Sequence, residues 1–167
     1  MIYILSNEKG RERSFSDTDW WHLYKLAEKN GLDPEDTKLD PDTVAFSKGK
    51  REIDEEVLDE VAKWDGSYFP KSHQKAIVTE KSALNWATTL ENVLKRDIIP
   101  DEPLPEHVKK SLDIGKLTVG RLVMELDATD SAEYFGGSQG KETLRDFIAF
   151  CQEGGFSISY RPEPRGK

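Results

Sequence analysis

The stretch that decides the fold is "ETLRDFIAFCQEGGFSISY", residues 142–160. Its first half repeats apolar side chains at the i, i+3, i+4, i+7 spacing of a helix face, namely Leu144, Phe147, Ile148 and Cys151. Gly154 and Gly155 end that helix, and "FSISY" then alternates apolar and polar residues as a half-buried strand does. We therefore expect a C-terminal helix followed by a strand that returns to a sheet.

The opposite end of the chain offers a partner for that strand. Ile2 to Leu5 form a short apolar run that is β-branched and aromatic and is followed by polar turn residues. We expect this N-terminal strand to lie beside the C-terminal one. The fold class predicted is α+β, a helix-dominated single domain over residues 1–167 with a small sheet that includes the N- and C-terminal strands.

Three helices are predicted between the two terminal strands. The first begins after a cap at Ser16 or Asp17 and ends at Gly31, the second covers Asp54 to Trp64, and the third begins after Thr79. Each has an apolar stripe at helical spacing.

The other segments are connections. Residues 33–51 read as a loop with one strand around Val44 to Phe46, and residues 98–106 read as a proline-rich surface crossing. Residues 106–130 fit a helix or a strand, with helix weakly favoured. Residues 161–167 read as a short flexible tail.

Composition limits the classes of function. The chain has 167 residues, 36% of them hydrophobic, and a net charge of −8 that is spread over its whole length. Such a field repels nucleic acid phosphates and anionic membrane surfaces, so neither is expected as a partner. No segment approaches the ~20 apolar residues of a membrane span. A single cysteine allows no intramolecular disulfide, and a cytoplasmic location is the expectation.

"YFGGSQGKET", residues 134–143, contains the Gly-x-Ser-x-Gly spacing of a hydrolase nucleophile at Ser138. That motif requires a buried strand before the serine and a histidine after it. No apolar run precedes Ser138, and every histidine precedes it in the sequence. A phosphate-binding loop fails too, because Glu142 stands where a hydroxyl is needed. We expect the glycines only to lead into a helix.

No other catalytic, metal or cofactor motif is predicted. Cys151 shares the apolar face of its helix, where a thiol is inert. His22, His73 and His107 have no second ligand at metal-binding spacing, and His22 is expected on the outer face of its helix. The expected catalytic residues, metal ligands and cofactors are therefore none.

The strongest charge feature is "EIDEEVLDEVAKWD", residues 52–65, with seven acids against one base. On a helix, like charges at i, i+4 repel each other, so a basic partner would stabilise such a face. The alternative is an ordinary solvated face. The candidate partner-binding acids are Glu52, Glu55, Glu56, Asp59 and Glu60.

Three aromatic residues are candidates for the same surface. Trp21 follows an inward-facing tryptophan, and Tyr68 and Phe69 lie in a loop bounded by glycine and proline. Exposed aromatic residues often anchor protein interfaces, whereas packing under a loop is the alternative for each.

Several segments resemble a loose family of small, acidic, uncharacterised bacterial proteins. They are "SFSDTDWWHLYKLAEKNGLDP", "SYF…AIVTEKSALNWATTLENVLKRDIIP" and "ETLRDFIAFCQEGGFSI", which together cover under half of the chain. The resemblance implies a bacterial, cytoplasmic origin and one compact domain. It implies no activity and no catalytic residue.

The leading hypothesis is a non-enzymatic, acidic protein-binding domain. Its partner would be a basic protein that it masks or neutralises, as a toxin-neutralising immunity protein does. One alternative is a small hydrolase with a site of dispersed Asp, Glu and His residues or Ser138. A second is a structural component of an assembly. The oligomeric state and the partner's identity are left open.

Overall fold

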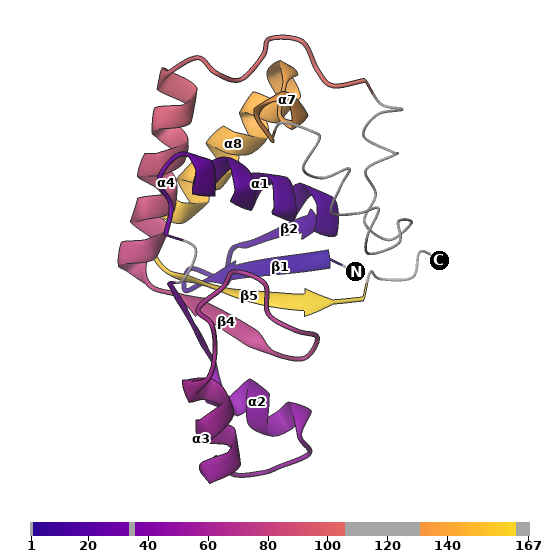
Figure 1. Ribbon diagram of the computed structural model, residues 1–167, viewed down its shortest axis with the longest axis vertical. Coiled ribbons are helices and arrows are strands. Elements are labelled where there is room, and N and C mark those ends of the chain that lie inside the picture. Colours follow the sequence, from indigo (N-terminus) through magenta and orange to yellow (C-terminus); the bar gives the residue numbers. More distant parts are fainter. Residues whose placement is uncertain (1, 34–35, 106–130, 163–167) are drawn as a thin grey trace.

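The computed structural model describes residues 2–33, 36–105 and 131–162. Within these ranges the chain forms five strands and six helices (Figure 1): β1 Ile2–Asn7, β2 Glu12–Ser16, α1 Asp17–Lys29, β3 Thr37–Leu39, α2 Pro41–Ser47, α3 Glu55–Ala62, β4 Lys75–Val78, α4 Glu80–Lys95, α7 Ser131–Tyr134, α8 Gly137–Gln152 and β5 Phe156–Arg161. The predicted α+β class is confirmed. The interpretation of residues 106–130 falls outside the described residues.

The sheet is antiparallel throughout, with strand order β2-β1-β5-β4-β3. The two terminal strands are neighbours, with Leu5 opposite Ile158 and Tyr3 opposite Tyr160. This pairing confirms the prediction that the C-terminal strand returns beside the N-terminal one. Because β5 also pairs with β4, the last strand of the chain joins the N-terminal hairpin to the β3–β4 pair.

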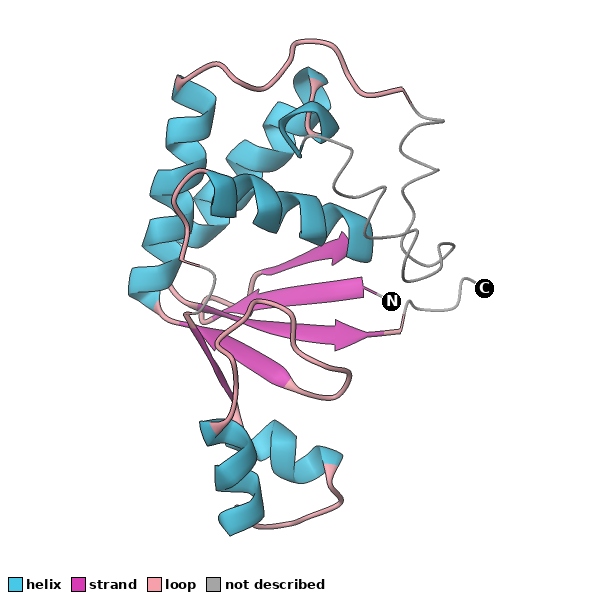
Figure 2. Ribbon diagram, viewed as in Figure 1, coloured by secondary structure: helices cyan, strands magenta, loops and turns pink. Residues whose placement is uncertain are grey.

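Helices α1, α4 and α8 cover one face of this sheet (Figure 2). Their contact is built from aromatic rings. The indoles of Trp20 and Trp86 stack with centroids 5.5 Å apart, and Phe147 meets both rings edge-on at 6.0 and 5.4 Å. Stacked and edge-to-face pairs are the favoured aromatic geometries, so α1, α4 and α8 share one close-packed centre.

Local sequence signals place the helix ends where they were predicted. Ser16 accepts a hydrogen bond from the Asp19 amide at 3.1 Å and begins α1, and Thr79 does the same for Ser82 at the start of α4. Gly154, with φ of +125°, follows the end of α8. Each cap pairs a backbone group that the helix itself leaves unpaired.

The segment 37–47 differs from the prediction. Val44 to Phe46, predicted as a strand, belong to helix α2, and a strand lies earlier, at Thr37–Leu39. The Asp40 side chain accepts from the Asp42 amide at 3.0 Å, and Pro41 occupies the first helical turn. Proline's fixed φ suits that position, so Asp-Pro begins a helix here rather than extending a loop.

Candidate protein-binding surface

Helices α2 and α3 form a separate projection of the molecule, residues 41–62, which we call the α2–α3 arm. Figure 1 shows it below β4, on the far side of the sheet from α4 and α8. A small core of its own holds it together, consisting of Leu39, Val44, Ala45 and Val57. Trp64 packs against both this core and the main one, so it joins the arm to the body.

The arm exposes large apolar side chains. Phe46 is 78% exposed, Leu58 53% and Ile53 44%. Only three other large apolar side chains are as exposed elsewhere in the described ranges, namely Ile77, Leu84 and Ile98. Ile53 precedes α3, which begins only at Glu55. Half of the exposed large apolar residues thus lie within a segment of 22 residues.

The predicted acidic residues lie on the same arm. Glu55, Glu56, Asp59 and Glu60 are on α3, and Glu52 lies in the turn before it. The cap of α3 is Asp54, which accepts from the Val57 amide at 3.0 Å. Because Glu52 lies outside the helix, the i, i+4 repulsion expected along a helix does not apply between Glu52 and Glu56.

Two lysines from the loop between α2 and α3 neutralise part of this charge. Lys48 pairs with Glu56 at 3.1 Å and with Glu60 at 2.9 Å, and Lys50 pairs with Asp54 at 2.6 Å and also with Glu56. Hydrogen bonds from these lysines hold the pKa of Glu56 below its usual value. The expected self-repulsion is therefore relieved within the arm, and a partner is not needed for that purpose.

Other acids on the arm are exposed and have few or no internal ion pairs. The carboxylates of Glu52 and Glu55 have no ion pair or hydrogen bond within the described part of the chain, and both residues are exposed. Asp59 is paired only with exposed Lys63, at 2.9 Å. Exposed carboxylates of α3 therefore precede and follow exposed Leu58 in the sequence, at Glu55 and Asp59.

The predicted aromatic residues do not join this surface. Tyr68, a candidate interface residue, is fully buried, and its ring meets Trp86 edge-on at 5.2 Å, so it is not an exposed interface residue. The Trp20 indole donates to the Tyr68 carbonyl at 2.9 Å, which draws the loop under α1. Half-buried Phe69 contacts half-buried Trp21 at 5.8 Å. The alternative reading, packing under a loop, describes Tyr68 and Phe69.

His22 is also inside the protein, contrary to the expectation of an outer position. It is fully buried, its Nδ1 lies 3.2 Å from the Ser131 hydroxyl, and its ring stacks on Tyr134 at 4.1 Å. The Tyr134 hydroxyl in turn donates to Asp19. These contacts bind α7 to α1. The apolar period of α1 did not reveal them because Ser131 and Tyr134 lie more than 100 residues away in sequence.

The glycines around Ser138 are explained by close packing. Helix α7, not a buried strand, precedes them, and Ser138 itself is exposed at the start of α8. A Cβ atom at Gly136 would lie 2.3 Å from the Glu102 carbonyl oxygen, and one at Gly140 only 1.9 Å from that of Phe135. The glycines lead into helix α8, as predicted, and their spacing reflects close backbone contacts that the sequence did not reveal.

The predicted position of Cys151 on the apolar face of its helix is confirmed. Cys151 is fully buried on α8, and burial raises its pKa well above the usual value. The thiolate is the reactive form of cysteine, so Cys151 is a core residue.

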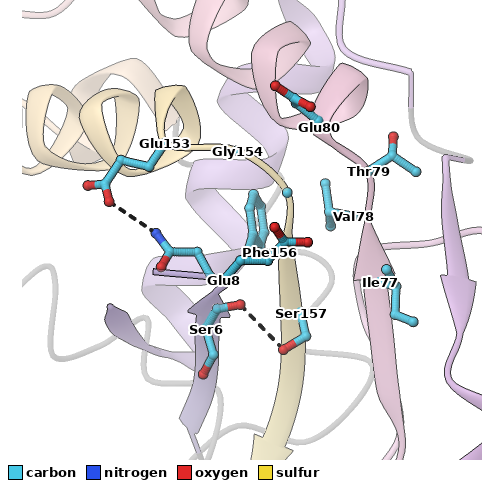
Figure 3. Close-up of a pocket in the computed structure, with 12 residues that line it drawn as sticks. Ser6, Glu8, Ile77, Val78, Thr79, Glu80, Glu153, Gly154, Phe156 and Ser157 are labelled. Atoms are coloured by element: carbon cyan, nitrogen blue, oxygen red, sulfur yellow. Dashed lines mark hydrogen bonds between the residues drawn. The ribbon is translucent and has the colours of Figure 1, made fainter. Parts of the chain in front are cut away.

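An open cavity of about 490 Å³ lies where β1, β5 and β4 meet the ends of α4 and α8 (Figure 3). Glu8, Glu80 and Glu153 line it, and Glu153 is paired with Arg11 at 2.8 Å. Figure 3 shows Ser157 bonded to the Ser6 backbone rather than directed at a carboxylate. No group of three or more His, Cys, Asp or Glu residues in the described ranges could hold a metal ion. The cavity thus shows no nucleophile activated by a base.

None of the described helices is long and apolar enough to cross a bilayer.

The chain was compared with protein families, curated proteins and solved structures. No protein-family model matches the chain, and no curated protein and no solved structure matches it either. The resemblance to small acidic bacterial proteins therefore stays a prediction from the sequence, and function has to be inferred from the surfaces themselves.

Proposed function

We propose that this protein is a non-enzymatic binding domain whose α2–α3 arm docks onto a basic protein partner. The observation that carries the proposal is the concentration of exposed Phe46, Ile53 and Leu58 on one projecting segment. Exposed apolar clusters rimmed by polar residues are typical of protein interaction sites. A large aromatic side chain such as Phe46 suits a pocket at the centre of an interface.

The charge of the arm supports a basic partner. Residues 41–62 contain seven acidic and three basic residues, and Glu52 and Glu55 are exposed without internal ion pairs in the described structure. Rim charges of this kind act mainly on the association rate and on the choice of partner. The partner surface is therefore expected to be an apolar pocket with lysines and arginines around it.

The internal ion pairs assign different roles to the predicted acids. Glu56 and Glu60 hold Lys48 and so fix the loop between α2 and α3. They act on the shape of the arm, whereas Glu52 and Glu55 are the carboxylates that would face the partner. This division narrows the candidate surface to Phe46, Ile53 and Leu58 with Glu52 and Glu55.

The test is affinity capture from the native cell with the intact protein and two matched variants. Phe46→Asp with Leu58→Asp replaces the two most exposed large apolar side chains of the arm, and Leu84→Asp with Ile98→Asp replaces two exposed apolar side chains elsewhere. We expect one basic protein to be retained by the wild type and by the second variant but lost with the first. Circular dichroism confirms that both variants are folded.

A purified partner then allows the charges to be tested. Glu52→Lys with Glu55→Lys should slow association and weaken its dependence on salt, while Lys81→Glu on α4 should not. Retention of the partner by the Phe46→Asp, Leu58→Asp variant would refute docking through the arm. Capture of only another copy of this chain would replace the basic partner by self-association.

A further inference from the structure

A second hollow, distinct from the protein-docking surface in its chemistry, lies between α2 and the ends of β4 and β5. Its volume is about 460 Å³, and its walls are formed by α2, the turn before β4, and the last residues of β5. We infer that this cavity binds a small organic anion, with a carboxylate or phosphate group carried on an apolar body. Cavities of roughly 300–1,000 Å³ are the usual size for small-molecule sites.

The pairing of β4 with β5 brings two cations together in this cavity. Lys75 lies directly opposite Ser159, and Arg161 follows two residues later on the same face of β5. Diagonal neighbours of this kind are about 7–8 Å apart across a sheet. Neither cation has an ion pair within the described residues, although the chain has a net charge of −8.

No carboxylate is among the described residues that line the cavity. Two like charges that line one cavity repel each other, and an anion between them would replace that repulsion by attraction. Arginine binds carboxylates and phosphates through two parallel hydrogen bonds, whereas lysine contributes a point charge. Lys75 and Arg161 thus supply both kinds of contact from adjoining strands.

Polar groups beside the cations favour the same ligand. The Ser159 hydroxyl has no hydrogen bond within the described ranges and lines the cavity floor from a residue only 8% exposed. His73 lines the cavity at a turn with φ of +66°, where glycine would be less strained. Retaining an imidazole there has a conformational cost, which favours a role for this side chain at the cavity.

Apolar residues in the cavity wall favour a ligand with an apolar body over an inorganic ion. Phe46, which is 78% exposed, and Pro162, the residue after β5, both line the cavity. Thr43 and Gln74 are already engaged, since Thr43 accepts from the Lys75 amide at 3.1 Å and Gln74 donates to Glu60 at 3.0 Å. The first bond holds α2 beside the start of β4, and the second holds α3 to the turn before β4.

The experiment is a titration of the 167-residue chain with four probes, monitored by two-dimensional NMR. Phenyl phosphate and benzoate carry the expected anion on a ring, inorganic phosphate lacks the ring, and benzyl alcohol lacks the charge. We expect saturable shifts of the Lys75 and Ser159 amides with phenyl phosphate, benzoate or both, and which of the two binds more tightly identifies the head group. Inorganic phosphate and benzyl alcohol should bind at least about tenfold more weakly.

Two variants test the residues and one controls for charge. Lys75→Gln and Arg161→Gln should each weaken binding by about tenfold or more, whereas Lys81→Gln on α4 should leave it unchanged. The same spectra report whether each variant is folded. The assignment is wrong if neither ring-bearing anion binds saturably, or if both cavity variants bind like the wild type. If inorganic phosphate bound as tightly as phenyl phosphate, the proposal that the ligand has an apolar organic body would be refuted.

The outcome is separable from the docking proposal. Lys75 and Arg161 are cations outside the α2–α3 arm, so their substitution by glutamine removes no contact on which docking of a basic partner depends and should not abolish its capture. Phe46 belongs to both surfaces and is therefore left intact in this experiment.

Discussion

His22 of α1 lies nearly parallel to Tyr134 of α7, with ring centroids 4.1 Å apart and 13° between the ring planes. The histidine is fully buried, and its Nδ1 is within hydrogen-bond distance of Ser131 at the start of α7. A residue that the sequence suggested to be solvated therefore joins two helices.

Replacing His22 by alanine removes this stack and leaves the Ser131 hydroxyl without its ring partner. We expect the free energy of unfolding to fall by about 2–4 kcal/mol. Lys81→Ala, at an exposed position of α4, is the control and should change it by less than about 0.5 kcal/mol. Urea denaturation of both variants measures the difference, and equal midpoints would contradict the structural role of His22.

The glycine motif yields a second prediction. Gly140→Ala places a Cβ atom against the Phe135 carbonyl, so α7 and α8 must move apart, and we expect a loss of about 1–3 kcal/mol in the free energy of unfolding. Ser138→Ala, two residues earlier and exposed, should be nearly neutral. Thermal melts distinguish the two. A larger loss for Ser138→Ala would mean that the hydroxyl has a role that packing does not explain.

The ion pairs of the arm predict a dependence on pH. Lys50 lowers the pKa of both Asp54 and Glu56 in the folded protein, so their contribution to stability is complete above the usual carboxyl pKa of about 4 and is lost as the pH falls through the lowered values. Lys50→Gln should therefore lower Tm near neutral pH, and the difference from wild type should close in acid. Lys81→Gln, which has no ion pair among the described residues, should show no such convergence.

Burial of Cys151 predicts that its thiol reacts slowly with reagents in solution. Its raised pKa and full burial should keep the thiol unreactive toward an aromatic disulfide reagent in the native protein at pH 8. Reaction should become fast once urea unfolds the chain, and its native rate should rise in Gly140→Ala because unfolding is then more frequent. Rapid reaction of the native wild type would show that the thiol is accessible.

Helix ends and strand directions could be read from the sequence because their causes are local. Ser16 and Thr79 satisfy amide groups two or three residues away, and Gly154 ends α8 by its own backbone freedom. The apolar period of α8 and the alternation in β5 likewise need only neighbouring residues. These signals were sufficient for the α+β class and for the pairing of the terminal strands.

Short elements were misread where a local signal had two meanings. "DPDTVAFS" contains a proline and two β-branched residues, which suggested a loop and a strand. Packing of Val44 and Ala45 against Val57 stabilises it as a helix instead. The Asp-Pro pair alone does not determine that this segment is a helix, because the packing against α3 cannot be seen in the sequence.

Both candidate surfaces depend on contacts between distant parts of the chain. The acids of α3 are visible as a run of letters, but Lys48 reaches Glu60 only because α2 and α3 pack together. Lys75 and Arg161 are 86 positions apart and become neighbours through one strand pairing. Backbone propensity and the spacing of apolar residues depend on only a few neighbouring residues, so the elements that they determine could be predicted from the sequence. The electric field around each charge depends on which other charges lie within a few ångströms, and that became known only once the strands and helices were assembled.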